Sequence, residues 1–341
     1  MGSVSDHDRV DEEISCIIDE LPLPGASGHA LRAQMRAATT GGKRFRPRLV
    51  LESFRAFASS SPFPDSLWRV AAGYEILHAA FVVHDDIIDQ DTHRRGRLNV
   101  RGDLARQAQT AGEDEAASTR IGDAGALLVG DLLLYAASRT ILTADAEAPV
   151  RARLAAHLDA ALAVSAAGEW EDATRAGADR DAALGMTANK TAVYSFTAPL
   201  CAGAALAGAD EDAEQTLRAV AHELGVAFQL ADDLIGAFGT DAQAGRESGA
   251  DLREGKRTPL VALAQESAEW PEVEGALALA NTGPVAVRRA QRMLERSGAR
   301  DRTVVLLRGH LERARAQAAE LPVGIVMLVE DVAAEIEGRV P

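Results

Sequence analysis

Apolar residues recur at helical spacing over almost the whole chain, and this periodicity is the feature that most restricts the possible folds. Spacings of three and four residues predict helices because they place the apolar side chains on one face. We expect helices over residues 10–21, 28–39, 48–58, 67–90, 121–143, 150–171, 181–207, 210–238, 258–265, 285–297, 303–319 and 321–341. The sequence shows no convincing strand-like alternation between turn pairs, so we predict an all-α protein.

The composition and the breaks between helices agree with one large helical bundle. Aromatic residues make up only 4% of the 341 residues, and Ala, Leu and Val supply most of the apolar content. Ala and Leu favour helix over sheet. Turn residues cluster at 21–25, 59–64, 108–119, 239–254 and 281–284. None of these stretches is long or biased enough to be an interdomain linker, so we predict a single domain over residues 1–341.

The charge and the cysteines exclude several classes of protein. A formal net charge of −15 argues against a nucleic-acid partner or an anionic membrane surface, because both require a broad positive surface. Cys16 and Cys201 form neither a CxxC pair nor a Cys/His metal spacing. The first residues lack the apolar segment of a secretory signal, and no unbroken apolar run has the length of a membrane span. We therefore expect a cytoplasmic protein without membrane insertion.

An apolar segment that ends in clustered carboxylates carries the clearest chemical signal. Residues 74–89 read YEILHAAFVVHDDIID, which places Asp85 and Asp89 one helical turn apart on one face, with Asp86 beside them. Such carboxylates repel one another unless a cation lies between them, and all-oxygen ligation suits Mg2+. His78 lies two turns before Asp85 and can reach the same site. A solvated acidic helix end is the alternative interpretation.

Two basic clusters stand out in this acidic chain. Residues 93–97 read HRRGR directly after the first aspartates, and residues 41–48 read GGKRFRPR. Arginine binds phosphate oxygens in a bidentate manner. Glycines allow the backbone to approach an anion, and Pro47 at a helix start leaves amide groups pointing toward it. Magnesium and arginine together commonly hold a diphosphate. An ordinary basic loop is the alternative for residues 41–48.

A second carboxylate motif occurs at residues 228–236, which read FQLADDLIG. Gln229, Asp232 and Asp233 share a helical face, and Gly236 stands where a third aspartate would repeat the first motif. Residues 249–256, GADLREGK, add a lysine just before a helix.

These motifs resemble the trans-isoprenyl diphosphate synthases of the polyprenyl synthetase family, over about residues 41–256. The resemblance implies the isoprenoid synthase fold, a helical bundle with a central active-site cavity, and Mg2+ as the cofactor. It places the metal on Asp85 and Asp89 of the first motif and on Asp232 and Asp233 of the second. The two sets of carboxylates would face each other across the cavity.

The resemblance also implies roles for individual residues. Isopentenyl diphosphate would be bound by Lys43, Arg46, His78 and Arg95. The allylic diphosphate would be bound by Arg94, Lys190, Thr191, Gln229 and Lys256. The residues expected to act in catalysis are Asp85, Asp86, Asp89, Arg94, Lys190 and Asp232. Two positions depart from the family pattern, namely Gly236 and residues 169–172, which read EWED where the family has Gln-x-x-Asp.

The expected chemistry is the ionisation of an allylic diphosphate, attack by isopentenyl diphosphate and loss of a proton. Magnesium, arginine and lysine suit it because they stabilise the negative charge on the departing diphosphate. The product would grow along the helix that carries the first aspartates, with Ala80 and Phe81 as candidates for the tunnel floor. A helical turn rises about 5.4 Å, comparable to one isoprene unit. Ordinary core packing of Phe81 is the alternative interpretation.

The resemblance favours geranylgeranyl diphosphate as the product, with farnesyl diphosphate as the alternative. A terpene cyclase shares the fold but binds no second diphosphate, so Lys43, Arg46 and Arg95 count against it. A non-catalytic partner subunit would be expected to lose aspartates that this chain retains. The resemblance further implies a homodimer.

Overall fold

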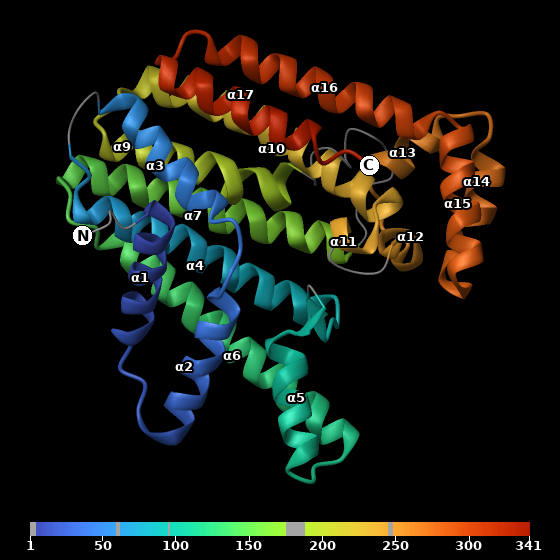
Figure 1. The fold of residues 1–341 in the computed structure, drawn as a ribbon, viewed down its shortest axis with the longest axis horizontal. Coiled ribbons are helices and arrows are strands. Elements are labelled where there is room, and N and C mark those ends of the chain that lie inside the picture. Colours follow the sequence, from blue (N-terminus) through green and yellow to red (C-terminus); the bar gives the residue numbers. More distant parts are fainter. Residues whose placement is uncertain (1–4, 59–61, 95, 175–187, 245–247) are drawn as a thin grey trace. The chain divides into compact units, whose positions relative to one another are not determined.

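The computed structural model describes residues 5–58, 62–94, 96–174, 188–244 and 248–341, which form helices almost throughout (Figure 1). The chain divides into two compact units. Unit 1 comprises Met1–Leu158 and Pro199–Ala209, and unit 2 comprises Asp159–Ala198 and Asp210–Pro341. The single domain over residues 1–341 and the central cavity stay predictions.

Unit 1 consists of helices and one short hairpin. Its elements are α1 (Asp6–Asp19), α2 (Gly25–Thr39), α3 (Phe45–Phe57), α4 (Asp65–Ile88), β1 (His93–Arg94), β2 (Arg97–Leu98), α5 (Val100–Thr110), α6 (Glu115–Leu142), the first part of α7 (Ala148–Ala173) and most of α9 (Ala198–Leu206).

Helix α4 is the central element of unit 1. Its side chains are buried along most of its length, and α1, α3 and α6 pack around it. Helix α6 lies directly alongside, where a Cβ atom on Gly73 would stand 3.0 Å from Ile141 Cγ1 (Figure 1). At Gly130 of α6 a Cβ atom would meet the His84 ring at 2.3 Å. These close contacts fix the course of α4, whose C-terminal end carries the first aspartates.

Side-chain caps set where several helices begin. Asn99 caps α5, Asp114 caps α6 and Asp210 caps α10 (Glu211–Phe238). Each accepts a hydrogen bond from the backbone amide three residues further on, at 2.7–2.8 Å. Such a cap contributes about 1 kcal/mol because it satisfies an amide that has no partner within the helix.

The regular elements in the described residues of unit 2 are all helices. Its further elements are the π-helix η1 (Ala188–Thr197), α10, α11 (Asp241–Ala244), α12 (Ala250–Glu254), α13 (Pro259–Gln265), α14 (Trp270–Leu277), the 3-10 turn η2 (Ala280–Thr282), α15 (Pro284–Arg296), α16 (Ala299–Ala318) and α17 (Val323–Glu337). Helix α10 is its central element and packs against η1, α16 and α17. Gly225 allows η1 to approach, since a Cβ atom there would lie 2.2 Å from Ala192 Cβ.

The all-α fold class is confirmed, and most predicted helices occur within a few residues of their expected bounds. Several short elements were missed. Helices α5 and α14 were not predicted. The end of α5 and the first residues of α6 lie in the predicted break at 108–119, and α11 and α12 lie in the predicted break at 239–254. The hairpin of β1 and β2 was also missed, because strands of two residues are too short to show alternation.

One described helix, α6, is long and apolar enough to cross a membrane, and 44% of its most apolar window is buried inside the structure. A core helix of a globular protein passes the same test. Ala126, Val129 and Leu133 of α6 are fully buried, which agrees with a core helix.

Candidate active site

The first carboxylates lie at the C-terminal end of α4. Asp85 and Asp86 belong to its last turn and Asp89 is the residue that ends it. The Asp89 amide donates to the Asp85 carbonyl at 2.8 Å, so these two residues are one turn apart as predicted. A helix C-terminus carries partial negative charge, and α4 has no basic residue in its last turn. Three carboxylates there require a cation.

Arg94 supplies part of that positive charge. The β1–β2 hairpin turns at Gly96, whose φ of 73° lies in the left-handed region, and pairs Arg94 with Arg97. The Arg94 guanidinium then donates to Asp86 Oδ1 from Nη2 at 2.8 Å and to Asp85 Oδ2 at 3.2 Å. Sequence reasoning assigned Arg94 to the allylic diphosphate, and the structure places it against the carboxylates that would hold the metal of that ester.

Burial determines the electrostatics of this pair. Asp86 is only 3% exposed, and burial raises its pKa although Arg94 acts in the opposite direction. The Arg94 guanidinium is itself desolvated, yet the carboxylates of Asp86 and Asp85 raise its pKa. Asp86 thus holds Arg94 in place, and its predicted catalytic role stays a prediction. Asp85 and Asp89 are the more accessible carboxylates.

The second group of predicted residues lies in the loop before α3 and in the first turn of that helix. Lys43 is exposed, Arg44 and Arg46 are buried, and Gly41 and Gly42 precede them with positive φ angles. Arg44 Nη1 donates to Glu75 Oε1 of α4 at 3.2 Å, which attaches the loop to the helix that carries His78 one turn later. His78 is partly exposed in an otherwise buried stretch. The loop is thus held beside the part of α4 that carries His78, and the first aspartates lie further along the same helix.

The residues predicted to set product length lie on the same helix. Ala80 is fully buried and Phe81 is partly exposed. Both precede Asp85 by about one turn, as the sequence requires. Their role in a tunnel stays a prediction.

The second carboxylate motif lies on α10. Gln229 Nε2 donates to Asp233 Oδ1 at 3.1 Å, whereas Asp233 Oδ2 is buried with no hydrogen-bond partner among the described residues. Burial, followed by repulsion from Asp251 and Asp232, raises the pKa of Asp233 to about 8. A buried carboxyl of this kind is stable either protonated or beside a cation.

Asp251 is a site residue that sequence reasoning missed. It lies on α12, is 7% exposed, and faces α10 at Gly236. A Cβ atom on Gly236 would come within 1.7 Å of Asp251 Oδ2, so no larger residue fits at that position unless Asp251 moves. The departure at Gly236 is therefore explained, because the space of the absent third aspartate is filled by a carboxylate from α12.

Two basic residues lie near the second motif. The Lys256 amine is 3.3 Å from Glu254 Oε2, and the same lysine lowers the pKa of Asp233. Arg339, which follows α17, forms an ion pair with Asp232 and stacks on the Phe228 ring with 4.3 Å between Cζ and the ring centroid. Sequence reasoning did not identify Arg339, which is 107 residues from Asp232 in the chain.

Three predicted residues cannot be placed fully. Arg95 lies outside the described residues. Lys190 and Thr191 lie in η1, but their side chains are outside the described part of the structure.

The carboxylates fit magnesium without forming a complete site. Within the described ranges, no three His, Cys, Asp or Glu side chains converge on one point that could hold a metal ion. Magnesium typically takes one or two carboxylates and completes its shell with water and substrate phosphates. The buried, partnerless Asp233 Oδ2 and the oxygen-only donor sets agree with such partial ligation.

The fold and the site together define a class of helical proteins in which carboxylate pairs at helix ends are accompanied by arginine and lysine. The family model for polyprenyl synthetase matches residues 29–294. The chain belongs to the polyprenyl synthetase family, whose members are enzymes, and the predicted resemblance is confirmed.

Individual relatives are similar over most of the chain. A geranylgeranyl diphosphate synthase of Mycobacterium tuberculosis is 34% identical over 238 residues, covering 68% of this chain and 61% of that protein. A geranylfarnesyl diphosphate synthase of Aeropyrum pernix is 30% identical and covers 88% of each chain. The crystal structure of a geranylgeranyl pyrophosphate synthase from Corynebacterium glutamicum, complexed with isoprenyl diphosphate and magnesium, has a TM-score of 0.90, is 27% identical and covers 98% of both chains.

Proposed function

We propose that the protein is a magnesium-dependent trans-prenyltransferase that condenses isopentenyl diphosphate with dimethylallyl, geranyl or farnesyl diphosphate. The observation that carries the proposal is the end of α4, where Arg94 closes on Asp85 and Asp86 while the same helix anchors the loop of Lys43 and Arg46. One helix thus presents carboxylates for a metal and cations for a phosphate. A terpene cyclase binds no second diphosphate, so it does not need the loop of Lys43 and Arg46.

The chain's own residues would act by holding charge. Magnesium, when bound, supplies positive charge that stabilises the departing diphosphate. Asp85 and Asp89 would hold it at the first motif, and Asp232 and Asp233 at the second. Arg94 would support the ester beside the first motif, and Lys43 and Arg46 would hold isopentenyl diphosphate with its double bond toward the allylic carbon. The proton lost from the adduct requires no side-chain base, because the released diphosphate can accept it.

Product analysis tests the proposal directly. The purified chain is incubated with isopentenyl diphosphate and each of the three allylic diphosphates, with and without Mg2+, and the products are separated by chromatography. We expect elongation only when both substrates and Mg2+ are present. Hydrocarbon release from an allylic diphosphate alone would identify a cyclase, and lack of any turnover would favour a non-catalytic partner subunit.

We propose geranylgeranyl diphosphate as the main product. The similar Corynebacterium glutamicum protein is a geranylgeranyl pyrophosphate synthase, which supports this chain length. The Aeropyrum pernix relative is a geranylfarnesyl diphosphate synthase, whose product is longer. Farnesyl diphosphate is the runner-up. The same chromatography separates the three lengths.

We further propose a cytoplasmic homodimer with α6 at its interface. Leu127, Leu128 and Tyr135 of α6 are 51%, 52% and 56% exposed, although its other face is buried. Such an apolar strip is typical of a subunit interface. Light scattering after size exclusion should give twice the 35.9 kDa mass of one chain, and Leu128→Asp should shift the protein toward monomer.

A further inference from the structure

Arg44 has an unusual backbone conformation for an arginine. Its φ of 49° and ψ of 43° are left-handed, and it directly precedes the first residue of α3. A residue other than glycine is strained in this region and persists there only where its surroundings hold it. The contacts of the Arg44 side chain must therefore offset this strain.

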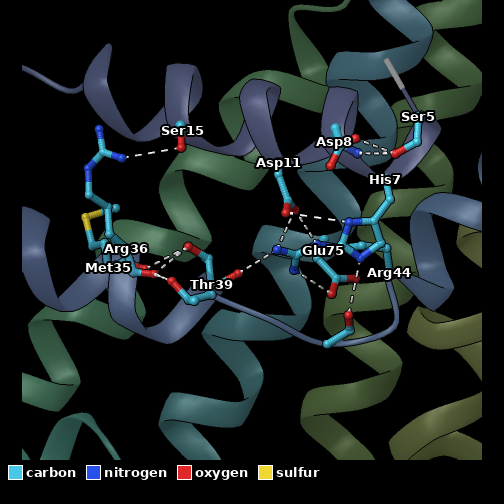
Figure 2. A network of polar contacts seen from close by, with 12 residues as sticks. Ser5, His7, Asp8, Asp11, Ser15, Met35, Arg36, Thr39, Arg44 and Glu75 are labelled. Carbon is cyan, nitrogen blue, oxygen red and sulfur yellow. Dashed lines mark hydrogen bonds and ion pairs between the residues drawn. The ribbon is translucent and has the colours of Figure 1, made fainter. Parts of the chain in front are cut away.

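The Arg44 side chain is buried in an ionic network. The residue is 6% exposed, and its Nε donates to Asp11 Oδ1 of α1 at 2.6 Å. Its Nη1 donates to Glu75 Oε1 of α4 at 3.2 Å, and its Nη2 donates to the Thr39 carbonyl at the end of α2 at 3.0 Å. One guanidinium thus joins three helices to the start of α3 (Figure 2).

A histidine extends the network from α1 to the loop itself. His7 Nδ1 lies 3.6 Å from Asp11 Oδ2, and the other ring nitrogen lies 3.5 Å from the Gly42 carbonyl (Figure 2). Helix α1 therefore contacts the loop both at Gly42 and at Arg44. The two contacted residues, Gly42 and Arg44, directly precede and follow Lys43 in the sequence.

The burial of the Arg44 side chain determines how the neighbouring residues Lys43 and Arg46 are presented. With Arg44 buried in the network, Lys43 is exposed, and Arg46 is in the first turn of α3. Glu75, which receives Arg44, lies one turn before His78 on α4. The same network therefore sets the loop that carries Lys43 and the distance of this loop from His78.

We propose that Arg44 is a positioning residue, and that through Asp11 and Glu75 it makes α1 part of the isopentenyl diphosphate site. The proposal rests on the proposed function for the identity of the ligand. The family match begins at residue 29, so Asp11 lies outside the matched segment. The link between α1 and the loop rests on the contacts of Asp11 in this chain, which lie outside that matched segment.

The test uses the full chain and the substitution Asp11→Asn, which retains the side-chain shape and removes the charge. The Asp11 side chain is 44% exposed, so we expect the variant to fold. We expect KM for isopentenyl diphosphate to rise about tenfold, because small misplacements of a binding group have large effects, while KM for the allylic diphosphate changes less than about twofold. Asp8→Asn, an exposed carboxylate on the same helix, is the matched control and should change neither.

Hydrogen–deuterium exchange supplies a readout that needs no substrate. We expect amides of the 40–49 peptide to exchange about tenfold faster in Asp11→Asn than in the wild-type protein or in Asp8→Asn. Arg44→Lys should also exchange faster than the wild-type protein, since an ammonium cannot reach Asp11, Glu75 and the Thr39 carbonyl together.

The outcomes separate this inference from the proposed function. If Lys43→Ala weakens isopentenyl diphosphate binding while Asp11→Asn alters neither KM nor exchange, the positioning role is wrong and the proposed function stands. If the wild-type chain does not bind isopentenyl diphosphate, the proposed function and the ligand assignment both fail. The exchange of the 40–49 peptide then still decides whether the Arg44 network holds the loop.

Discussion

Binding of Mg2+ should release a proton, and Asp233 is the reason. Its carboxyl is buried, its Oδ2 has no described partner, and its pKa is raised to about 8. At pH 7 about 0.9 of the metal-free molecules would carry this proton, and at pH 9 about 0.1 would. A cation at Asp233 requires the ionised form, so we expect about 0.9 proton released per chain at pH 7 and nearly none at pH 9.

The same shift makes the metal-free protein less stable in alkali. A raised folded pKa contributes stability that is fully present below about pH 4 and is lost as the pH rises through about 8. Raising the pKa from 3.8 to about 8 corresponds to about 6 kcal/mol. We therefore expect Tm to fall between pH 5 and pH 9, and saturating Mg2+ to restore most of the loss at the alkaline end.

Calorimetric titration with Mg2+ in buffers of different ionisation enthalpy measures the proton count. Asp233→Asn should abolish the release and flatten the pH dependence of Tm. Asp212→Asn, an exposed carboxylate in the first turn of the same helix, is the matched control and should alter neither. A proton count that is the same at pH 7 and pH 9, or an unchanged release in Asp233→Asn, would show that Asp233 does not hold the cation.

Three further predictions concern single residues. Arg339→Ala should raise the affinity for Mg2+ about threefold, since Arg339 no longer competes for Asp232; an unchanged calorimetric Kd would contradict this. Gly236→Ala should destabilise the protein by about 1–3 kcal/mol and weaken Mg2+ binding, because Asp251 must move. Denaturant unfolding measures the loss of stability, and an unchanged free energy of unfolding would show that α12 can shift without cost. Phe81→Ala should lengthen the product, and an unchanged chromatogram would assign Phe81 to the core.

The sequence predicted the long helices well because each carries a strong apolar period. Helix α5 was missed since its sequence, VRGDLARQAQT, is polar and its start depends on the Asn99 cap. Asn99 with Gly102 and Asp114 with Ala117 could have been recognised as caps. The β1–β2 hairpin and the short helices α11 and α12 depend on tertiary contacts rather than on periodicity.

The site was predicted in part for the same physical reason. Residues close in sequence, such as Asp85 and Asp89 or Gln229 and Asp233, follow from helical geometry alone. Asp251 and Arg339 could not be found in this way, because their proximity to α10 arises from the folding of α12 and the end of α17. Arg44 appeared in the motif, but only the structure shows that it points inward to Asp11 and Glu75.

Negative charge at the two carboxylate motifs favours a bound cation in each unit. At the end of α4, Arg94 offsets one of the negative charges of Asp85, Asp86 and Asp89. On α10, Arg339 pairs with Asp232, and the charge of Asp251 disfavours the ionised form of Asp233. An arginine carries a single positive charge, whereas a divalent cation would add two beside each group of carboxylates. Each unit thus presents a cluster that gains stability when the cation arrives, which is why we expect Mg2+ to raise Tm even without substrate.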